Sequence, residues 1–246
     1  MKKIVSLILI MCSCFLIAAG NAGGLRYREY WFRMLTPVQK YDFTEFLTQL
    51  DLIRADHPKL MTEEAYAGLK ELGESALLAS GPLTLDEDPF EGTLYLWPSS
   101  LARPGEDQRI VPYIERGTAI ISFVIVSEKW WLNAEKAIFL GDTGDKMTIN
   151  VKPWDHAIDR TLSNDYMEIF APSFGYGEDE WRDMINNEAL SSVAVRFYGE
   201  DGRTEDYTLT EDEITAIRDV LNLQYAKKQL SDALQKWCES IEKINE

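Results

Sequence analysis

Cysteine is scarce in this chain of 246 residues, and two of the three cysteines lie close to the N-terminus. Cys12 and Cys14 fall within an apolar leader, so a processed chain would retain only Cys238. A single cysteine excludes an internal disulfide, and the processed chain must therefore be stabilised by its core. A Cys–His enzyme is disfavoured as well, because no histidine lies near Cys238 in the sequence.

Basic residues are also few. The chain has 25 Lys and Arg against 41 Asp and Glu, and loss of Lys2 and Lys3 with the leader would change the net charge from −16 to −18. Such a charge repels phosphate backbones and anionic lipid surfaces, so we expect no nucleic-acid partner. We also expect no cofactor. The charge indicates solubility, with a basic partner or bound cations as alternatives.

Long apolar runs are limited to one, Ile4–Ala19, which is shorter than the roughly 20 residues of a membrane span. Lys2 and Lys3 precede it, and the small residues Gly20-Asn21-Ala22 follow it. This order predicts a signal peptide over residues 1–22, cleaved after Ala22. We therefore expect an exported protein, periplasmic or extracellular, with no transmembrane segment after processing. A lipid anchor at Cys12 or Cys14 is the less favoured alternative, because Met11 is a poor neighbour for lipidation.

Histidine occurs only twice, and His156 lies in the acidic block Asp155-His156-Ala157-Ile158-Asp159. A metal site usually needs a second His or Cys, which this block lacks. We predict a polar loop here. A hydrolase that uses Asp155, His156 and Asp159 for acid–base chemistry is the alternative. No Gly-x-Ser-x-Gly elbow marks a nucleophile, although the members of a Ser-His-Asp triad can be distant in sequence.

Two acidic motifs are explained better by loops and turns than by cation binding or catalysis. Asp86, Asp88 and Glu91 are weak candidates for a cation site, but their spacing fits no EF-hand, so we predict a solvated loop. The triplet Asp142-Thr143-Gly144 occurs in aspartic proteases, where two copies are needed. Here there is one copy, between two predicted strands, and it therefore predicts a hairpin turn.

Apolar residues make up 46% of the chain, which is enough for a packed core. We predict an α+β protein: an N-terminal helical hairpin, a central antiparallel sheet forming a small sandwich or half-barrel, and a long C-terminal helix. Residues 23–246 form either a single domain or consecutive regions. These regions are 23–81 (helical, with helices from Thr36-Pro37 and after Thr62), 82–116 (a loop-rich seam with a strand at 94–97), 117–209 (antiparallel β with a short helix at 178–188) and 210–246 (the long helix).

The C-terminal helix is predicted from a capping box, in which Thr210 and Glu213 satisfy each other's backbone amides. Its second half carries a short seam with coiled-coil spacing. The seam and its neighbouring cysteine are Leu230, Leu234, Trp237, Cys238, Ile241 and Ile244. This face either packs on the N-terminal helices or binds another chain, as a homodimer or with a protein partner. In the second case Cys238 would be placed for an interchain disulfide.

The tryptophan pair Trp130-Trp131 follows a predicted buried strand. Adjacent residues on an extended chain face opposite ways, so one ring belongs to the core. The other ring either packs on the turn or binds a sugar or peptide.

The stretch Trp130-Trp131-Leu132 through Ile149, and Ser191–Phe197 running into the capped helix, resemble small exported bacterial domains of unknown function. The resemblance implies a β-rich exported domain and supplies no activity. We therefore expect a non-catalytic envelope protein that binds a protein or a small ligand. A periplasmic or secreted hydrolase and a self-associating structural subunit are the alternatives.

Overall fold

The computed structural model describes residues 22–101, 110–127, 131–151, 156–160, 166–171, 178–188 and 190–244. Of the predicted signal peptide, only Ala22 belongs to this part of the chain. The chain forms two compact units: the first combines the residues up to Leu77 with Lys228–Glu246, and the second spans Leu78–Lys227. The predicted α+β class is confirmed, since helices at both ends of the described chain accompany two antiparallel sheets.

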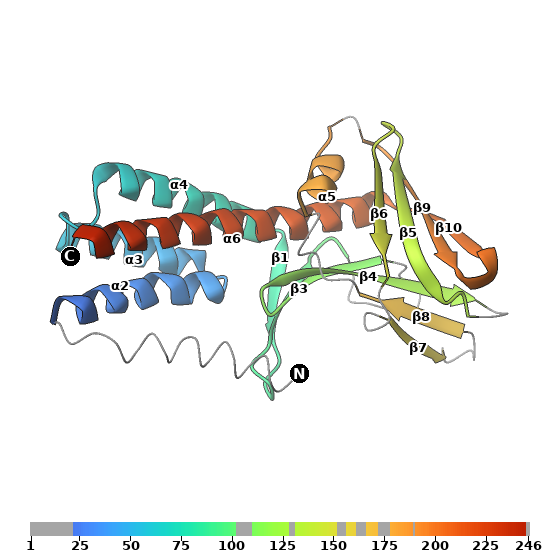
Figure 1. Cartoon of the computed structure of the whole chain (residues 1–246), viewed down its shortest axis with the longest axis horizontal. Coiled ribbons are helices and arrows are strands. Elements are labelled where there is room, and N and C mark those ends of the chain that lie inside the picture. Colours follow the sequence, from blue (N-terminus) through green and yellow to red (C-terminus); the bar gives the residue numbers. More distant parts are fainter. Residues whose placement is uncertain are drawn as a thin grey trace. The chain divides into compact units, whose positions relative to one another are not determined.

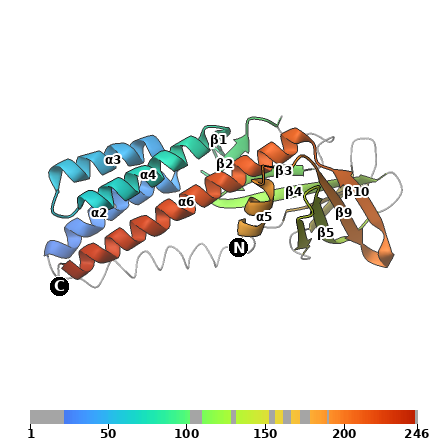
Figure 2. The same ribbon diagram turned by 90° about the horizontal axis from the view of Figure 1, so that it is seen from above.

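The first unit is a helical bundle. Its helices are α2 (Ala22–Gln39), α3 (Phe43–Asp56), α4 (Glu63–Ser80, whose last turn passes into the second unit) and the C-terminal part of α6 (Glu211–Ile244). They run side by side in Figures 1 and 2. The buried side chains between them include Met34, Val38, Phe43, Phe46, Leu50, Ile53, Leu69, Leu230 and Leu234. These side chains form the apolar core of the first unit.

The helix predicted to start at Thr36-Pro37 begins elsewhere. Both residues lie near the C-terminal end of α2, and α3 starts at Phe43. The Asp42 Oδ1 atom accepts a hydrogen bond from Glu45 N at 2.9 Å, which caps α3. Because Thr36 and Pro37 lie within α2 and Asp42 caps a separate helix, the N-terminal region has three described helices instead of a hairpin of two.

The second unit contains two antiparallel sheets in its described residues. The larger sheet has the strand order β1-β2-β3-β4-β8-β7, and the smaller one has the order β10-β9-β5-β6. Strands of the larger sheet are β1 (Leu83–Glu87), β2 (Leu94–Pro98), β3 (Ile110–Glu115), β4 (Thr118–Ser127), β7 (His156–Arg160) and β8 (Tyr166–Phe170). Strands of the smaller sheet are β5 (Ala134–Gly141), β6 (Lys146–Asn150), β9 (Val193–Gly199) and β10 (Thr204–Thr208).

The core of this unit lies between the two sheets. The Phe123 ring of β4 lies 5.5 Å from the Phe139 ring of β5 and 5.8 Å from the Phe197 ring of β9, centroid to centroid. All three side chains are at most 1% exposed. Tilted and edge-on ring pairs of this kind each add roughly 0.5–1.5 kcal/mol beyond the burial of their area. The sheets therefore pack face to face through aromatic side chains.

Two segments predicted as loops are strands. The seam over residues 82–116 contains β1 and β3 in addition to the strand predicted at 94–97, which β2 confirms, and the block around His156 forms β7. β1 is only five residues long, has largely exposed side chains and pairs with β2, while β3 includes Pro112 and pairs with β4. Exposed strands show little apolar alternation, and a proline counts against a strand. Their strand character comes from backbone pairing with the strand that follows each in the chain: β1 with β2, β3 with β4 and β7 with β8.

α6 begins at the predicted capping box, which is confirmed. The Thr210 Oγ1 atom accepts from Glu213 N at 3.2 Å, and the Glu213 carboxylate accepts from Thr210 N at 2.8 Å. The Tyr207 hydroxyl donates to the same carboxylate at 2.7 Å. Within the second unit, Gln224 Nε2 also donates to Gly117 O at 3.1 Å. These bonds attach the first part of α6 to β10 and to the β3–β4 turn.

Candidate functional site

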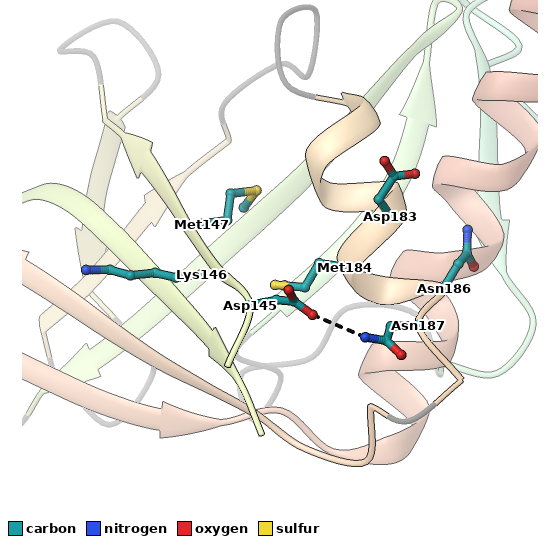
Figure 3. Close-up of a pocket in the computed structure, with 7 residues that line it drawn as sticks. All are labelled: Asp145, Lys146, Met147, Asp183, Met184, Asn186 and Asn187. Atoms are coloured by element: carbon teal, nitrogen blue, oxygen red, sulfur yellow. Dashed lines mark hydrogen bonds between the residues drawn. The ribbon is translucent and has the colours of Figure 1, made fainter. Parts of the chain in front are cut away.

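A pocket of about 690 Å³ lies in the second unit, beside the β5–β6 hairpin and the short helix α5 (Glu178–Ile185). The hairpin and α5 with the turn after it supply its lining, which is Asp145, Lys146, Met147, Asp183, Met184, Asn186 and Asn187 (Figure 3). In Figure 3 the Lys146 side chain extends away from the space beside α5. The remaining lining combines two carboxylates, two amides and two thioethers.

Backbone conformation and side-chain hydrogen bonds stabilise the turn of the β5–β6 hairpin. Gly144 has a φ of +92°, a conformation that glycine adopts without strain, and Gly144 N donates to Gly141 O at 3.0 Å. The Thr143 hydroxyl donates to Asp145 Oδ2 at 2.8 Å. Asp142 accepts from the backbone N–H and the hydroxyl of Ser191. The predicted turn over the triplet Asp142-Thr143-Gly144 is confirmed, and its first carboxylate is engaged in holding the start of the next segment.

The pKa of Asp142 reflects this environment. The hydrogen bond from the Ser191 side chain, followed by the one from the Ser191 backbone, lowers the pKa of the Asp142 carboxyl below its usual range. Both bonds favour the ionised form, because a carboxylate accepts them better than a carboxylic acid does. Asp142 is therefore ionised at neutral pH, as a structural turn residue should be.

Amide side chains fix the other wall of the pocket. Asn187 Nδ2 donates to Asp145 Oδ2 at 3.2 Å, which joins the end of α5 to the hairpin (Figure 3). Asn186 Nδ2 donates to Asn222 Oδ1 of α6 at 2.9 Å. The Arg218 guanidinium donates to the Ile185 carbonyl at 2.9 Å. The lining is therefore held in place before any ligand binds, which lowers the cost of binding.

Two methionines line the pocket beside these polar groups, with little of either side chain exposed. Met147 comes from β6 and is 7% exposed, and Met184 comes from α5 and is 5% exposed. Methionine side chains are flexible and polarisable, and they adapt to ligands of different shape. The lining can therefore bind a small molecule that is part polar and part apolar. Among the described residues that line the pocket, none is Ser, Cys or His.

The predicted hydrolase block is only partly described. His156 is the first residue of β7 and Asp159 lies within it, while Asp155 falls outside the described residues. The side chains of His156 and Asp159 fall outside the description too. The catalytic role of these three residues stays a prediction.

The tryptophan pair is described only for its second member, since Trp130 lies outside the described residues. The Trp131 ring meets the Tyr166 ring edge-on, with centroids 4.8 Å apart. The Trp131 carbonyl accepts from Arg203 Nη1 at 2.6 Å. Trp131 is half-buried and belongs to a turn that is held from both sheets, and its role in binding stays a prediction.

The predicted cation candidates take part in local contacts. Asp86 lies in β1, and Asp88 Oδ1 accepts from Phe90 N at 2.8 Å. Glu91 pairs with Arg116, whose Nη2 lies 3.0 Å from Glu91 Oε2. Within the described ranges, no group of three His, Cys, Asp or Glu side chains is arranged to hold a metal ion.

The predicted interaction seam of α6 is buried inside the first unit. Its described side chains Leu230, Leu234, Trp237, Cys238 and Ile241 are at most 6% exposed. Trp237 Nε1 donates to the Leu60 carbonyl at 3.1 Å. Of the two alternatives for this face, packing on the N-terminal helices accounts for these contacts, whereas Ile244 has no described side chain. Binding of another chain there stays a prediction, and it would have to displace this packing.

Sequence reasoning missed the pocket. Its members belong to two segments, 145–147 and 183–187, and neither has a recognisable motif. The hairpin turn was predicted, but nothing in the sequence indicates that α5 lies against it. Asn186 and Asn187 were the best indication of a binding site in the sequence, because two neighbouring amides after a short amphipathic helix are suited to hydrogen bonding.

Comparison with known proteins gives no further assignment, since the chain matches no protein-family model and no curated protein sequence. The site must therefore be interpreted from its own chemistry. As for membranes, none of the described helices is both long enough and apolar enough to span a bilayer.

Proposed function

We propose that this chain is an exported, non-catalytic envelope protein that binds a small ligand in the pocket between α5 and the β5–β6 hairpin. The leader-like residues 1–22 support export. The lining of the pocket carries the binding role, because it combines carboxylates, amides and thioethers that are already held in place. A concave site with an apolar surface and a few placed polar groups is typical of ligand binding.

The test is a ligand screen with the full chain, using free amino acids, short peptides, monosaccharides and disaccharides. A ligand should raise the thermal midpoint of the wild type, because it stabilises the folded state by mass action. Asn187→Leu keeps the side-chain size but removes the amide, and it should weaken binding by about tenfold or more. Asn150→Leu, an exposed position on β6, is the matched control and should bind like the wild type.

Two outcomes would contradict the proposal. One is that no compound of these classes binds. The other is a ligand whose affinity is the same for Asn187→Leu and the wild type, since the pocket would then not be the site. Turnover of a hydrolase substrate that is lost in His156→Ala would instead favour the hydrolase. The self-associating subunit would be favoured by a dimer that Trp237→Ala dissociates.

A further inference from the structure

Among the large apolar side chains of the described residues, Phe90 has the highest exposed fraction, ahead of Leu78 at 80%. Phe90 lies in the turn between β1 and β2, and 95% of its surface is exposed. Leu85, in the adjacent strand, is 50% exposed, and the exposed Leu140 of β5 reaches 48%. Phenylalanine is seldom left fully in water, because burying its ring is worth roughly 1.5–3 kcal/mol. An aromatic ring exposed in this way is suited to insertion into an apolar pocket on another molecule.

The backbone around Phe90 is ordered. Asp88 Oδ1 accepts from Phe90 N at 2.8 Å and from Glu91 N at 3.2 Å. Gly92 N donates to Asp88 O at 2.8 Å, and Gly92 has a φ of +63°, which favours glycine. Hydrogen bonds to Asp88 therefore hold the backbone at Phe90, Glu91 and Gly92.

Arg116, at the β3–β4 turn, braces the same hairpin. Its Nη2 lies 3.0 Å from Glu91 Oε2, and its Nε donates to Thr93 Oγ1 at 3.3 Å. Thr93 itself is 5% exposed. A ring on a braced turn loses little conformational entropy when it is bound, which increases its contribution to affinity.

The charge next to the ring indicates the kind of partner. Asp86, Glu87, Asp88 and Glu91 lie within four residues of Phe90, and Arg116, which pairs with Glu91, leaves an excess of negative charge there. Acidic groups around an apolar anchor repel anionic lipid headgroups. They attract a protein surface that carries Lys and Arg, and they guide it during encounter.

We infer that the β1–β2 turn is a docking element, in which Phe90 inserts into an apolar pocket of a partner protein whose rim is basic. Buried aromatic anchors dominate the binding energy of many protein interfaces, and charged rims set their specificity. This inference goes beyond the proposed function, because it concerns a protein partner and a surface that shares no residue with the α5 pocket.

The test places a photo-crosslinking phenylalanine analogue at position 90 of the full chain, produced in its native cells. The same analogue at Leu140, which is exposed on β5, is the control. We expect one discrete protein adduct from position 90 that is not formed from position 140. The partner is then identified and purified, and its Kd for the chain is measured directly.

The variants separate docking from folding. Phe90→Ser should weaken binding roughly thirtyfold, as for an interface anchor, and Leu140→Ser should leave the Kd unchanged. Glu87→Lys should weaken binding several-fold at low salt and have less effect at about 0.5 M salt, where charges are screened. The thermal midpoint of Phe90→Ser should stay within about 2 °C of the wild type, because the ring is exposed.

Three results would overturn the inference. They are the absence of a discrete protein adduct at position 90, an adduct formed with lipid, and a purified partner that binds Phe90→Ser as tightly as the wild type. None of them bears on the ligand test at Asn187, so the two proposals succeed or fail separately.

Discussion

At the residue scale, Glu168 and Gly199 show how one turn is held by both sheets. Glu168 in β8 is 1% exposed, and its carboxylate accepts from Asn133 N at 2.8 Å and from Ala134 N at 3.1 Å. From the smaller sheet, Gly199 approaches so closely that an added Cβ would lie 1.9 Å from the Leu132 carbonyl oxygen. A buried carboxylate that bonds backbone amides fixes the path of the chain between β4 and β5.

The close approach at Gly199 leads to the first prediction. Gly199→Ala should lower the free energy of unfolding by about 3 kcal/mol or more, because the methyl group would displace backbone atoms. Gly68→Ala is the comparison: nothing lies within 4 Å of its added Cβ in α4, so it should raise stability by roughly 0.5–1 kcal/mol. Urea unfolding of both variants measures the difference. If Gly199→Ala is as stable as the wild type, the Leu132 carbonyl does not lie against Gly199 as described.

Asp142 provides a prediction about pH. Ser191→Ala removes the strongest cause of its lowered pKa, so the pKa of Asp142 should rise toward the usual value near 4. Because the folded pKa lies below the unfolded one, the stabilisation by this group is present above the unfolded pKa and is lost as the pH falls. Carboxyl NMR titration of the wild type and Ser191→Ala measures the shift. An unchanged titration curve would remove Ser191 as the cause.

At the element scale, helix starts are decided by caps. Asp42 caps α3, and Thr210 with Glu213 caps α6. The Glu213 carboxylate is 4% exposed and is also bonded by the Tyr207 hydroxyl. The cap of α6 therefore ties the helix to β10 in addition to satisfying its own amides.

Removal of the α6 cap is the prediction at this scale. Thr210→Ala should cost about 1 kcal/mol of stability, because Glu213 N loses its side-chain acceptor. Thr210→Ser keeps a hydroxyl and should stay within about 0.5 kcal/mol of the wild type. Denaturant unfolding monitored by circular dichroism compares the three proteins. If Thr210→Ser is as unstable as Thr210→Ala, the lost stability comes from the methyl group of Thr210 and not from its capping hydroxyl.

At the scale of the whole molecule, the two units are stabilised by different means. The helical unit buries a continuous apolar face without a disulfide, and its only cysteine in the described residues is 4% exposed. The sheet unit depends on aromatic contacts between its two sheets. A chain with net charge −16 can fold in this way because most of the acidic side chains in its described part are exposed to water.

Burial of Cys238 leads to the last prediction. In the chain that starts at Gly23, a thiol reagent should modify Cys238 about a hundredfold more slowly than an exposed thiol, because access requires opening of the helical unit. Glu239→Cys in a Cys238→Ala background supplies that exposed comparator, since Glu239 is exposed. Equal rates would mean that α6 does not pack on the N-terminal helices, and would favour the interaction surface predicted for this face.

Some features of the protein follow from the sequence alone. The α+β class, the strand at Thr118–Ser127 and the helix over 211–244 follow from local patterns, since apolar periodicity and capping residues act over a few positions. The hairpin at Asp142-Thr143-Gly144 belongs to the same group, because its glycine adopts the positive φ that the turn requires. These features need no information from distant residues.

Only the tertiary structure decided the rest. Strands β1, β3 and β7 exist because each pairs with the strand that follows it, and this pairing satisfies backbone groups in segments whose own side-chain pattern does not indicate a strand. The pocket forms because α5 lies against a hairpin some forty residues earlier in the sequence, joined by the hydrogen bond between Asn187 and Asp145. Exposure of Phe90 and burial of Trp237 could not be told apart in the sequence either, since both are aromatic residues whose environment depends on what packs against them.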